Sequence, residues 1–201
     1  MTERPAQTPR LYLIRHGETD WSLSGRHTGR TDLPLTPAGE AAARDLAPWL
    51  RDVGFVAVLT SPRRRAVDTC SLAGLAAAAE VEADLAEWDY GAYEGLRSRD
   101  IRRTRPDWDV FRDGCPDGET PVQIYDRADR VIVRACALRG PVALFSHGQF
   151  GAALAARWIG LSVVEGRHFS LSPASLSILA VNPNHGDARV IDLWNATPRQ
   201  R

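Results

Sequence analysis

The amino-acid sequence predicts an α/β layered fold built on a mostly parallel sheet. Short apolar runs, typical of buried strands, alternate along the chain with longer segments of helical periodicity. Several of these longer segments begin with residues that cap helices. Strands that alternate with helices are typical of a parallel sheet covered by helices.

The first predicted strand is Leu11–Ile14, a compact apolar run. Thr36 is expected to cap the helix that follows, because Pro37 fits the first helical position. Apolar residues repeat on one face of this helix: Ala43, Leu46, Ala47 and Leu50. Pro48 is expected to bend the helix, since proline donates no backbone hydrogen bond and clashes with the preceding turn.

The middle of the chain is expected to hold a strand and two helices. The strand is Val56–Leu59, and a helix is expected to start at Ser61-Pro62 and stop near Gly74. Thr120 and Gln123 form a capping box, which predicts the start of a further helix. The apolar face of that helix comprises Val131, Ile132, Ala135 and Leu138.

The last part of the chain completes the predicted sheet. Gly140 is expected to end the long helix, and Val142–Phe145 follows as a buried strand. A helix is expected from about Phe150 to Trp158. Ser175–Val181 and Val190–Trp194 are the predicted closing strands.

Polar groups follow three of the predicted strands directly. Arg15–Gly17 follows the first strand, Ser61–Arg65 follows the second, and Ser146–Gly148 follows the third. In α/β folds of this kind, ligands bind outside the carboxyl ends of the strands. We therefore expect these three segments to meet at one edge of the sheet and form a site.

Two histidines, His16 and His147, stand at strand ends. A neutral imidazole is a good nucleophile toward phosphorus, and nearby guanidinium groups of Arg15 and Arg65 disfavour the protonated form. The same groups neutralise the oxygens of a phosphoryl group during its transfer. Either histidine alone would be interpreted as a structural residue, but two histidines beside arginines favour phosphoryl transfer.

Glu87 is the candidate for the general acid that protonates the leaving alkoxide. Its neighbours Trp88 and Tyr90 are expected to lower the local dielectric. Asp89 and Glu18 are alternatives on chemistry alone, and a solvated surface carboxylate is the simplest interpretation of Glu87 by itself.

Short motifs occur in a fixed order along the chain. They include Leu13–Thr19, Gly25–Gly29, Thr31–Thr36, Ser61–Ala66, Glu87–Gly91, Gly118–Thr120 and Ser146–Gly148. In this order they resemble the histidine phosphatase superfamily, in its phosphoglycerate mutase-like branch. The resemblance covers most of the chain from Leu11 to about Trp158. It implies a three-layer α/β/α sandwich with a mixed, mostly parallel central sheet.

The resemblance also implies roles for residues at matching positions. His16 would be the phosphorylated nucleophile, and Glu87 would donate a proton and later activate water. Arg15, Arg65 and His147 would complete the phosphate pocket. Further contacts to phosphate or substrate would come from Ser22, Thr28, Gly29, Tyr90, Gly148 and Gln149. The resemblance implies no metal and no cofactor, and it is compatible with a homodimer.

Departures from the mutases of this family favour hydrolysis. Ser22 stands where mutases usually carry asparagine, and Ser98 stands about where they carry lysine. The mutases are usually longer, with loops that exclude water. A narrower resemblance to the branch of sedoheptulose bisphosphatase and some actinobacterial acid phosphatases favours sugar phosphates as substrates. A rim for a second phosphate, or else a solvated helix face, is expected from Arg97, Arg99, Arg102 and Arg103.

Composition sets the remaining expectations. The 201 residues suit one domain, 11–201, after a loose tail, 1–10. The formal net charge is zero, so no global field attracts nucleic acid or membrane. The chain contains no lysine, which excludes a P-loop or a Schiff-base lysine. The three cysteines form no CxxC pair, which favours reduced thiols in the cytoplasm.

Other functions remain open. A mutase would shuttle the phosphoryl group, and an inactive relative would only bind phosphorylated ligands. A metallohydrolase has enough ligands in His16, His27, His147 and Glu87, yet no HExxH motif supports it. RNA binding by the run Arg97–Arg105 lacks interleaved aromatic residues. We therefore expect a small phosphorylated metabolite as the ligand, and no nucleic acid, membrane or metal.

Overall fold

Within residues 8–198, the part of the chain that the computed structural model describes, six strands form one sheet in the order β3-β2-β4-β1-β5-β6. Four neighbouring strands run parallel: β3 (Ala79–Val81), β2 (Ala57–Thr60), β4 (Pro141–Ser146) and β1 (Arg10–Arg15). The antiparallel strands β5 (Leu176–Asn182) and β6 (Ala188–Ala196) extend the sheet beyond β1. The predicted mixed, mostly parallel sheet is confirmed.

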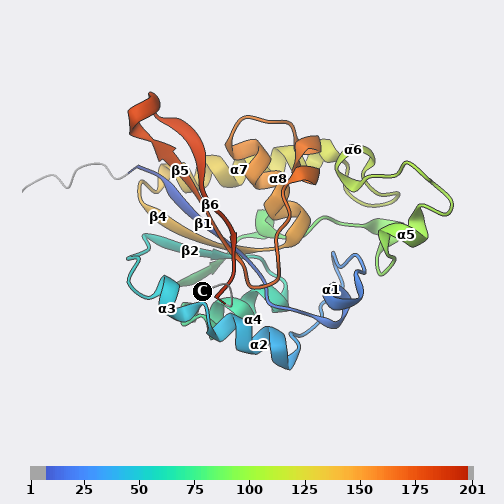
Figure 1. Cartoon of the computed structure of the whole chain (residues 1–201), viewed down its shortest axis with the longest axis horizontal. Helices are drawn as coiled ribbons and strands as arrows, with labels where there is room; N and C mark the ends of the chain where they lie inside the picture. Colours follow the sequence, from blue (N-terminus) through green and yellow to red (C-terminus); the bar gives the residue numbers. More distant parts are fainter. Residues whose placement is uncertain (1–7, 199–201) are drawn as a thin grey trace, which may run out of the picture.

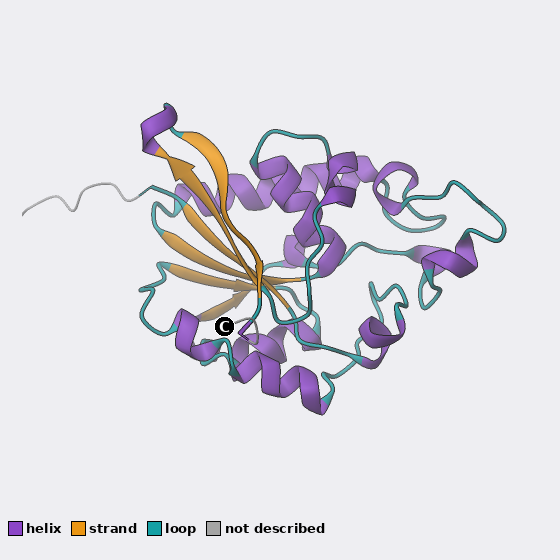
Figure 2. Cartoon of the chain, in the orientation of Figure 1, coloured by secondary structure: helices purple, strands orange, loops and turns teal. Residues whose placement is uncertain are grey.

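Helices cover both faces of this sheet (Figures 1 and 2). One face carries α7 (Pro121–Ala137) and α8 (Gly148–Trp158). The other face carries α2 (Pro37–Arg44), α3 (Ala47–Leu50) and α4 (Arg64–Leu72). Side chains alternate along β1. Leu11 and Leu13 pack in the core between the sheet and the helices α7 and α8, and Ile14 packs in the core on the opposite face. The three layers follow from this alternation.

Short helices and loops extend beyond the carboxyl ends of the parallel strands. Figure 1 shows α1 and α5 at the right of the view, with α6 above them. Their bounds are α1 (Asp20–Ser24), α5 (Ser98–Ile101) and α6 (Val110–Asp113). The 3₁₀ turns are η1 (Ala76–Ala78), η2 (Ala83–Leu85), η3 (Gly91–Tyr93), η4 (Val163–His168) and η5 (Pro183–His185). In the described part of the chain, no helix is long and apolar enough to cross a membrane.

Several predicted helix boundaries are wrong, and backbone geometry explains them. Pro48 does not bend one helix: α2 ends at Arg44, and α3 begins anew with Pro48 in its first turn, because proline is tolerated only there. The helix predicted from Ser61 starts at Arg64, since the preceding residue is extended. The long helix α7 stops at Ala137, before the predicted Gly140.

The end of α7 and two other boundaries differ from the predictions in further respects. The left-handed residue after α7 is Arg139, with φ of 48°, rather than Gly140. The helix predicted from Phe150 begins at Gly148. Of the predicted tail, residues 1–7 lie outside the described residues, and Arg10 belongs to β1.

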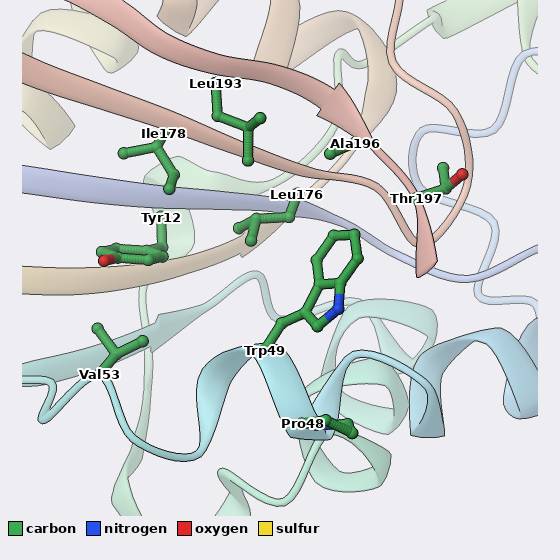
Figure 3. A pocket seen from close by; sticks show the side chains of 9 residues that line it. All are labelled: Tyr12, Pro48, Trp49, Val53, Leu176, Ile178, Leu193, Ala196 and Thr197. Atoms are coloured by element: carbon green, nitrogen blue, oxygen red, sulfur yellow. The ribbon is translucent and has the colours of Figure 1, made fainter. Parts of the chain in front are cut away.

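An apolar cavity of about 720 Å³ lies between α3 and the strands β1, β5 and β6 (Figure 3). Trp49 points from α3 toward the sheet, where Tyr12, Ile178 and Leu193 face the same space. Among the described residues that line it there is no histidine, arginine or carboxylate. This cavity therefore lacks the groups that phosphoryl transfer needs.

Candidate active site

The register of the parallel strands brings the predicted site residues to one edge of the sheet. Arg15 lies beside Ser146 in the pairing of β1 with β4, and the main-chain N–H of His16 donates to the Ser146 carbonyl at 3.0 Å. On the other side of β4, the N–H of Ser61 donates to a β4 carbonyl at 2.9 Å. His147 follows at the end of β4 as the N-cap residue of α8. The expected convergence of three strand ends is present.

His16 is buried and held in one tautomer. Its Nδ1 lies 2.7 Å from the carbonyl oxygen of Gly17, which can only accept, so Nδ1 carries the proton. Burial, followed by the charges of Arg15 and Arg65, lowers the pKa of His16 well below 6.5. The ring is therefore neutral near pH 7, with a lone pair on Nε2.

His147 holds the opposite tautomer. Arg65 Nε donates to His147 Nδ1 at 3.2 Å, so the proton lies on Nε2, which donates to Ser61 Oγ at 2.7 Å. Burial, followed by the charge of Arg65, lowers the pKa of His147 well below 6.5. The two histidine rings lie 5.1 Å apart between centroids, at 63°. Two neutral imidazoles with complementary proton positions thus lie side by side.

Arg65 is completely buried behind His147. Its Nη2 donates to the carbonyls of Thr28 and Gly29 at 2.8 and 3.1 Å, and its Nη1 donates to the carbonyl of Thr31 at 3.0 Å. These bonds tie the loop 28–31 to α4. Burial lowers the pKa of Arg65, although the carboxylate of Glu87 opposes this effect. Arg65 therefore acts on the histidines from behind rather than from the cavity itself.

Arg15 lies at the cavity, half-buried. Its Nη1 donates to the carbonyl of Leu171, and its Nε is buried without a hydrogen-bond partner among the described residues. Burial lowers the pKa of Arg15, and the carboxylate of Glu87 opposes this. An unpartnered guanidinium N–H beside His16 is a donor that suits a phosphate oxygen.

Glu87 is buried, and its carboxylate caps α8. Oε1 accepts from the backbone N–H of Trp88 at 2.9 Å and of Phe150 at 2.8 Å. Oε2 accepts from the N–H of Gln149 at 3.1 Å. His147, the N-cap residue, makes no side-chain capping bond, so Glu87 supplies one from a distant loop.

The two alternative acids are engaged elsewhere. Asp89 forms an ion pair with Arg30 at 2.8 Å, and Glu18 accepts from the hydroxyl of Thr36 at 2.8 Å. Neither of them lines the cavity that contains His16. Glu87 is therefore the carboxylate placed for proton transfer within the described residues of that cavity.

These groups surround a cavity of about 200 Å³. The described residues that line it are Arg15, His16, Ser22, Gly25, Arg26, His27, Thr28, Glu87, Tyr90, Ser98 and Gln149. Of the predicted site residues, Gly29, Arg65, Gly148 and His147 do not line it. Gly29 approaches the Trp88 carbonyl so closely that a Cβ would lie 2.4 Å from its oxygen. Gly148 lies against the guanidinium of Arg15.

Four cavity residues were absent from the predicted site: Gly25, Arg26, His27 and Ser98. His27 Nε2 lies 3.1 Å from Ser98 Oγ, and the His27 ring stacks on Tyr90 with centroids 4.5 Å apart. Burial lowers the pKa of His27 to about 4. The only sequence signal for the first three residues was their membership of the motif Gly25–Gly29.

The arginine run contributes differently from the expected rim. None of the four predicted rim arginines is among the described residues that line the cavity, although Ser98 between them is. Arg97 and Arg103 pair with Asp100 at 2.9 and 3.5 Å, and Arg102 donates to the carbonyl of Trp108. The solvated helix face describes this run better. Across residues 8–198, no group of three or more His, Cys, Asp or Glu side chains is arranged to hold a metal ion.

Residues 11–197 match the family model described as the histidine phosphatase superfamily, branch 1. The chain belongs to this superfamily. Within it, the chain is 45% identical over 173 residues to an acid phosphatase of Mycobacterium tuberculosis, which covers 84% of this chain and 85% of the relative. It is 37% identical over 192 residues to sedoheptulose 1,7-bisphosphatase of Saccharomyces cerevisiae, which covers 79% and 70%.

Solved structures of the superfamily share the fold. The product of an open reading frame of Mycobacterium tuberculosis superimposes with a TM-score of 0.88 at 41% identity, covering 94% of this chain and 98% of the other. The mycobacterial glucosyl-3-phosphoglycerate phosphatase superimposes with a TM-score of 0.81 at 26% identity, covering 94% and 100%. The predicted superfamily, fold and phosphatase class are confirmed.

Proposed function

We propose that this histidine phosphatase is a metal-independent phosphomonoesterase that hydrolyses small phosphorylated metabolites, with sugar phosphates foremost. The observation that carries the proposal is the state of His16: a buried, neutral ring whose Nδ1 is fixed on the Gly17 carbonyl. This leaves Nε2 as an unprotonated nucleophile in a cavity that also contains Arg15 and Glu87.

The first step forms a phosphohistidine. His16 Nε2 attacks phosphorus, and the bond from phosphorus to the ester oxygen breaks. Glu87 has to enter this step as the carboxylic acid, and it gives its proton to the departing alkoxide. Arg15 donates to the phosphoryl oxygens, and Arg65 lowers the proton affinity of His147 from behind. His147 stays neutral because its Nδ1 already accepts a hydrogen bond from Arg65 and therefore cannot take up a proton.

The second step releases phosphate. Glu87, now a carboxylate, takes a proton from water, and the oxygen attacks the phosphorus of the phosphohistidine. The nitrogen–phosphorus bond breaks, inorganic phosphate leaves, and His16 regains its starting state. Ser22 stands where the mutases of the family usually carry asparagine, and Ser98 stands about where they carry lysine. Both differences support transfer to water rather than to a second metabolite.

The substrate class is supported by the relatives. One is named an acid phosphatase and another a sedoheptulose 1,7-bisphosphatase, and both align with most of this chain. A cavity of about 200 Å³ suits a small metabolite better than a phosphorylated protein. We therefore place sugar phosphates before other phosphomonoesters.

The test is phosphate release from a panel of phosphomonoesters in excess chelator. The panel contains an aryl phosphate, two phosphoglycerates, and sugar mono- and bisphosphates. Wild type is expected to release phosphate, and His16→Ala is expected to lose at least about 10³-fold in kcat. The matched control is His185→Ala, at an exposed position outside the cavity. Equal activity of His16→Ala and wild type would refute the mechanism.

A further readout separates hydrolysis from shuttling. Rapid acid-free quenching is expected to trap phosphate on His16, and phosphoglycerates are expected to yield inorganic phosphate instead of their positional isomers. Isomer formation without phosphate release would instead identify a mutase. Binding of phosphorylated ligands without either product would identify an inactive binding module.

We also propose a cytoplasmic location and a homodimer. Cys70, Cys115 and Cys136 carry free thiols, which suits a reducing compartment. Fractionation of the producing cells would test the location, and light scattering of the purified protein would test the assembly. An oxidised, secreted protein or a monomer at micromolar concentration would contradict the respective proposal.

A further inference from the structure

Two loops that are far apart in sequence are joined above the cavity. Arg26 and Arg97 form an isolated antiparallel bridge. The N–H of His27 donates to the Leu96 carbonyl at 2.9 Å, and the N–H of Gly95 donates to the His27 carbonyl at 2.9 Å. These bonds, with the contact of His27 to Ser98, fix the backbone that carries the Arg26 side chain at the cavity.

Arg26 lines the cavity and forms no ion pair among residues 8–198, unlike Arg30, Arg97 and Arg103. Arg30 pairs with Asp89 at 2.8 Å, and both Arg97 and Arg103 pair with Asp100. The guanidinium of Arg26 lies over the ring of Trp21 instead, with its carbon 5.9 Å from the ring centroid. The wall of the cavity therefore includes an exposed arginine whose charge is not paired with a carboxylate of the described chain.

The charge of Arg26 does not contribute to the low pKa of His16. The arginines that lower the pKa of His16 are Arg15 and Arg65, and Arg26 is not among them. The cavity thus has one cationic part around His16, which suits the transferring phosphoryl group, and a second cationic part at Arg26. A substrate with a single phosphate needs only the first part.

We propose that Arg26 binds a second anionic group, a phosphate or a carboxylate, on the leaving-group side of the substrate. The enzyme then prefers phosphomonoesters that carry two anions. This inference rests on the proposed function, since it assigns the leaving group of that reaction. Ser98, the first residue of α5, adds a neutral hydroxyl to the same cavity. Arg26 is therefore a specificity residue, and the arginine run after Leu96 is not.

Matched substrate pairs test this proposal. Fructose 1,6-bisphosphate is compared with fructose 1-phosphate, and 2-phosphoglycerate is compared with glycerol 2-phosphate, which has a hydroxymethyl group in place of the carboxylate. Arg26→Ala is expected to raise KM about ten- to a hundredfold for the doubly anionic member of a pair. For the singly anionic member, KM and kcat are expected to change less than about threefold. The pair that responds shows whether the second anion is a phosphate or a carboxylate.

Three further variants complete the design. Arg26→Lys keeps the charge and is expected to retain part of the preference, and Arg26→Glu is expected to reverse it. Arg103→Ala removes a nearby arginine whose side chain is 77% exposed and does not line the cavity, so its KM values are expected to equal those of wild type. Thermal unfolding of each variant establishes that it is folded. If Arg26→Ala does not fold, the KM values of Arg26→Lys and Arg26→Glu decide whether Arg26 binds the second anion.

Several outcomes would overturn the proposal. One is an equal rise of KM for both members of each pair, which would place Arg26 on the transferring phosphoryl group. Another is the absence of any change. Loss of the preference in Arg103→Ala would return the role to the arginine run. Failure of the proposed function itself is distinct, because it would appear as equal activity of wild type and His16→Ala.

Discussion

At the scale of single residues, the site depends on two histidines that are neutral for the same two reasons. Burial is the main cause of the low pKa of both, and arginine charges come second. The arginines beside His16 could be inferred from the sequence, but the larger contribution of burial could not. Burial depends on how the loops close over the strand ends, and that is a property of the tertiary structure.

This ranking of causes can be tested on the nucleophile itself. Arg15→Gln removes one neighbouring positive charge, so the pKa of His16 is expected to rise but to stay below 6.5, because burial remains. The measurement is the titration of the ring proton resonances of His16 by NMR, with His16→Asn for assignment. A pKa at or above 6.5 in Arg15→Gln would show that charge, rather than burial, dominates.

The proposed role of Glu87 in proton transfer can be separated by experiment from its role in capping α8. Glu87→Gln retains an oxygen that can cap the helix but cannot transfer a proton, so kcat is expected to fall about 10²- to 10⁴-fold for sugar phosphates. For an aryl phosphate with a good leaving group, the loss in the phosphorylation step is expected to be much smaller. Phosphorylation is measured as the rate of alcohol release in single-turnover kinetics. Equal losses on both substrates would remove Glu87 as the acid.

At the scale of elements, α2 is fixed to the loop that follows His16, the proposed nucleophile. A Cβ on Gly39 would lie 2.3 Å from the Glu18 carbonyl oxygen, and a Cβ on Gly17 would lie 2.6 Å from the Gly39 carbonyl oxygen. The N–H of Thr36 also donates to the Glu18 carbonyl at 2.9 Å. The start of this helix therefore determines where the backbone after His16 lies.

Gly39→Ala is consequently expected to affect both stability and catalysis. Backbone must move to admit the methyl group, which is expected to lower the free energy of unfolding by about 1–3 kcal/mol. The same movement shifts the segment after His16, so kcat is also expected to fall. The measurements are urea unfolding and phosphate release. The control is Ala41→Ser, at an exposed position on the same helix, and wild-type values for Gly39→Ala would contradict this account of the contact.

Local signals explain which elements the sequence could predict. β1 and β4 extend only one residue beyond the predicted apolar runs at each end, because buried strands need continuous apolar residues. The capping box at Thr120 is present as predicted. β3 has no such signal, since its three residues are partly exposed and become a strand by pairing with β2.

The residues of the candidate site also differ in how far the sequence could predict them. Arg15, His16 and His147 follow strands directly, so their meeting could be derived from the strand pattern and the shared edge. Arg26 follows α1 and Ser98 begins α5, and the contact of these two segments depends on the bridge between Arg26 and Arg97. Nothing in the periodicity of either segment indicates this partner. The cavity walls are therefore less predictable than the catalytic centre.

At the scale of the whole molecule, three neutral buried histidines make stability depend on pH. The pKa of His27 is lowered to about 4, and those of His16 and His147 also lie well below 6.5. Below pH 6.5 the unfolded chain binds protons that the folded chain does not bind. The free energy of unfolding therefore decreases as pH falls from about 6.5 toward 4, by up to about 1.4 kcal/mol per pH unit for each histidine.

His27→Phe tests one part of this dependence. The phenyl ring is expected to keep the stacking on Tyr90 but to lose the titrating group, so the variant's stability should fall less steeply between pH 6 and pH 4. Urea unfolding at several pH values measures the slope. Ser98→Ala removes the hydroxyl partner without removing the histidine and is expected to retain most of the wild-type slope. An unchanged slope in His27→Phe would show that His27 does not contribute.

The position of β1 between β4 and β5 also has a consequence for the newborn chain on the ribosome. Both partners of β1, the strand that precedes the proposed nucleophile His16, are translated more than a hundred residues after it. At ordinary rates of translation this interval lasts on the order of ten seconds, during which Leu11, Leu13 and Ile14 have no native neighbours in the sheet. Chaperones that shield apolar segments are therefore expected to bind this strand early. Because β4 and β5 complete the sheet around β1, activity is expected only after the C-terminal third has left the exit tunnel.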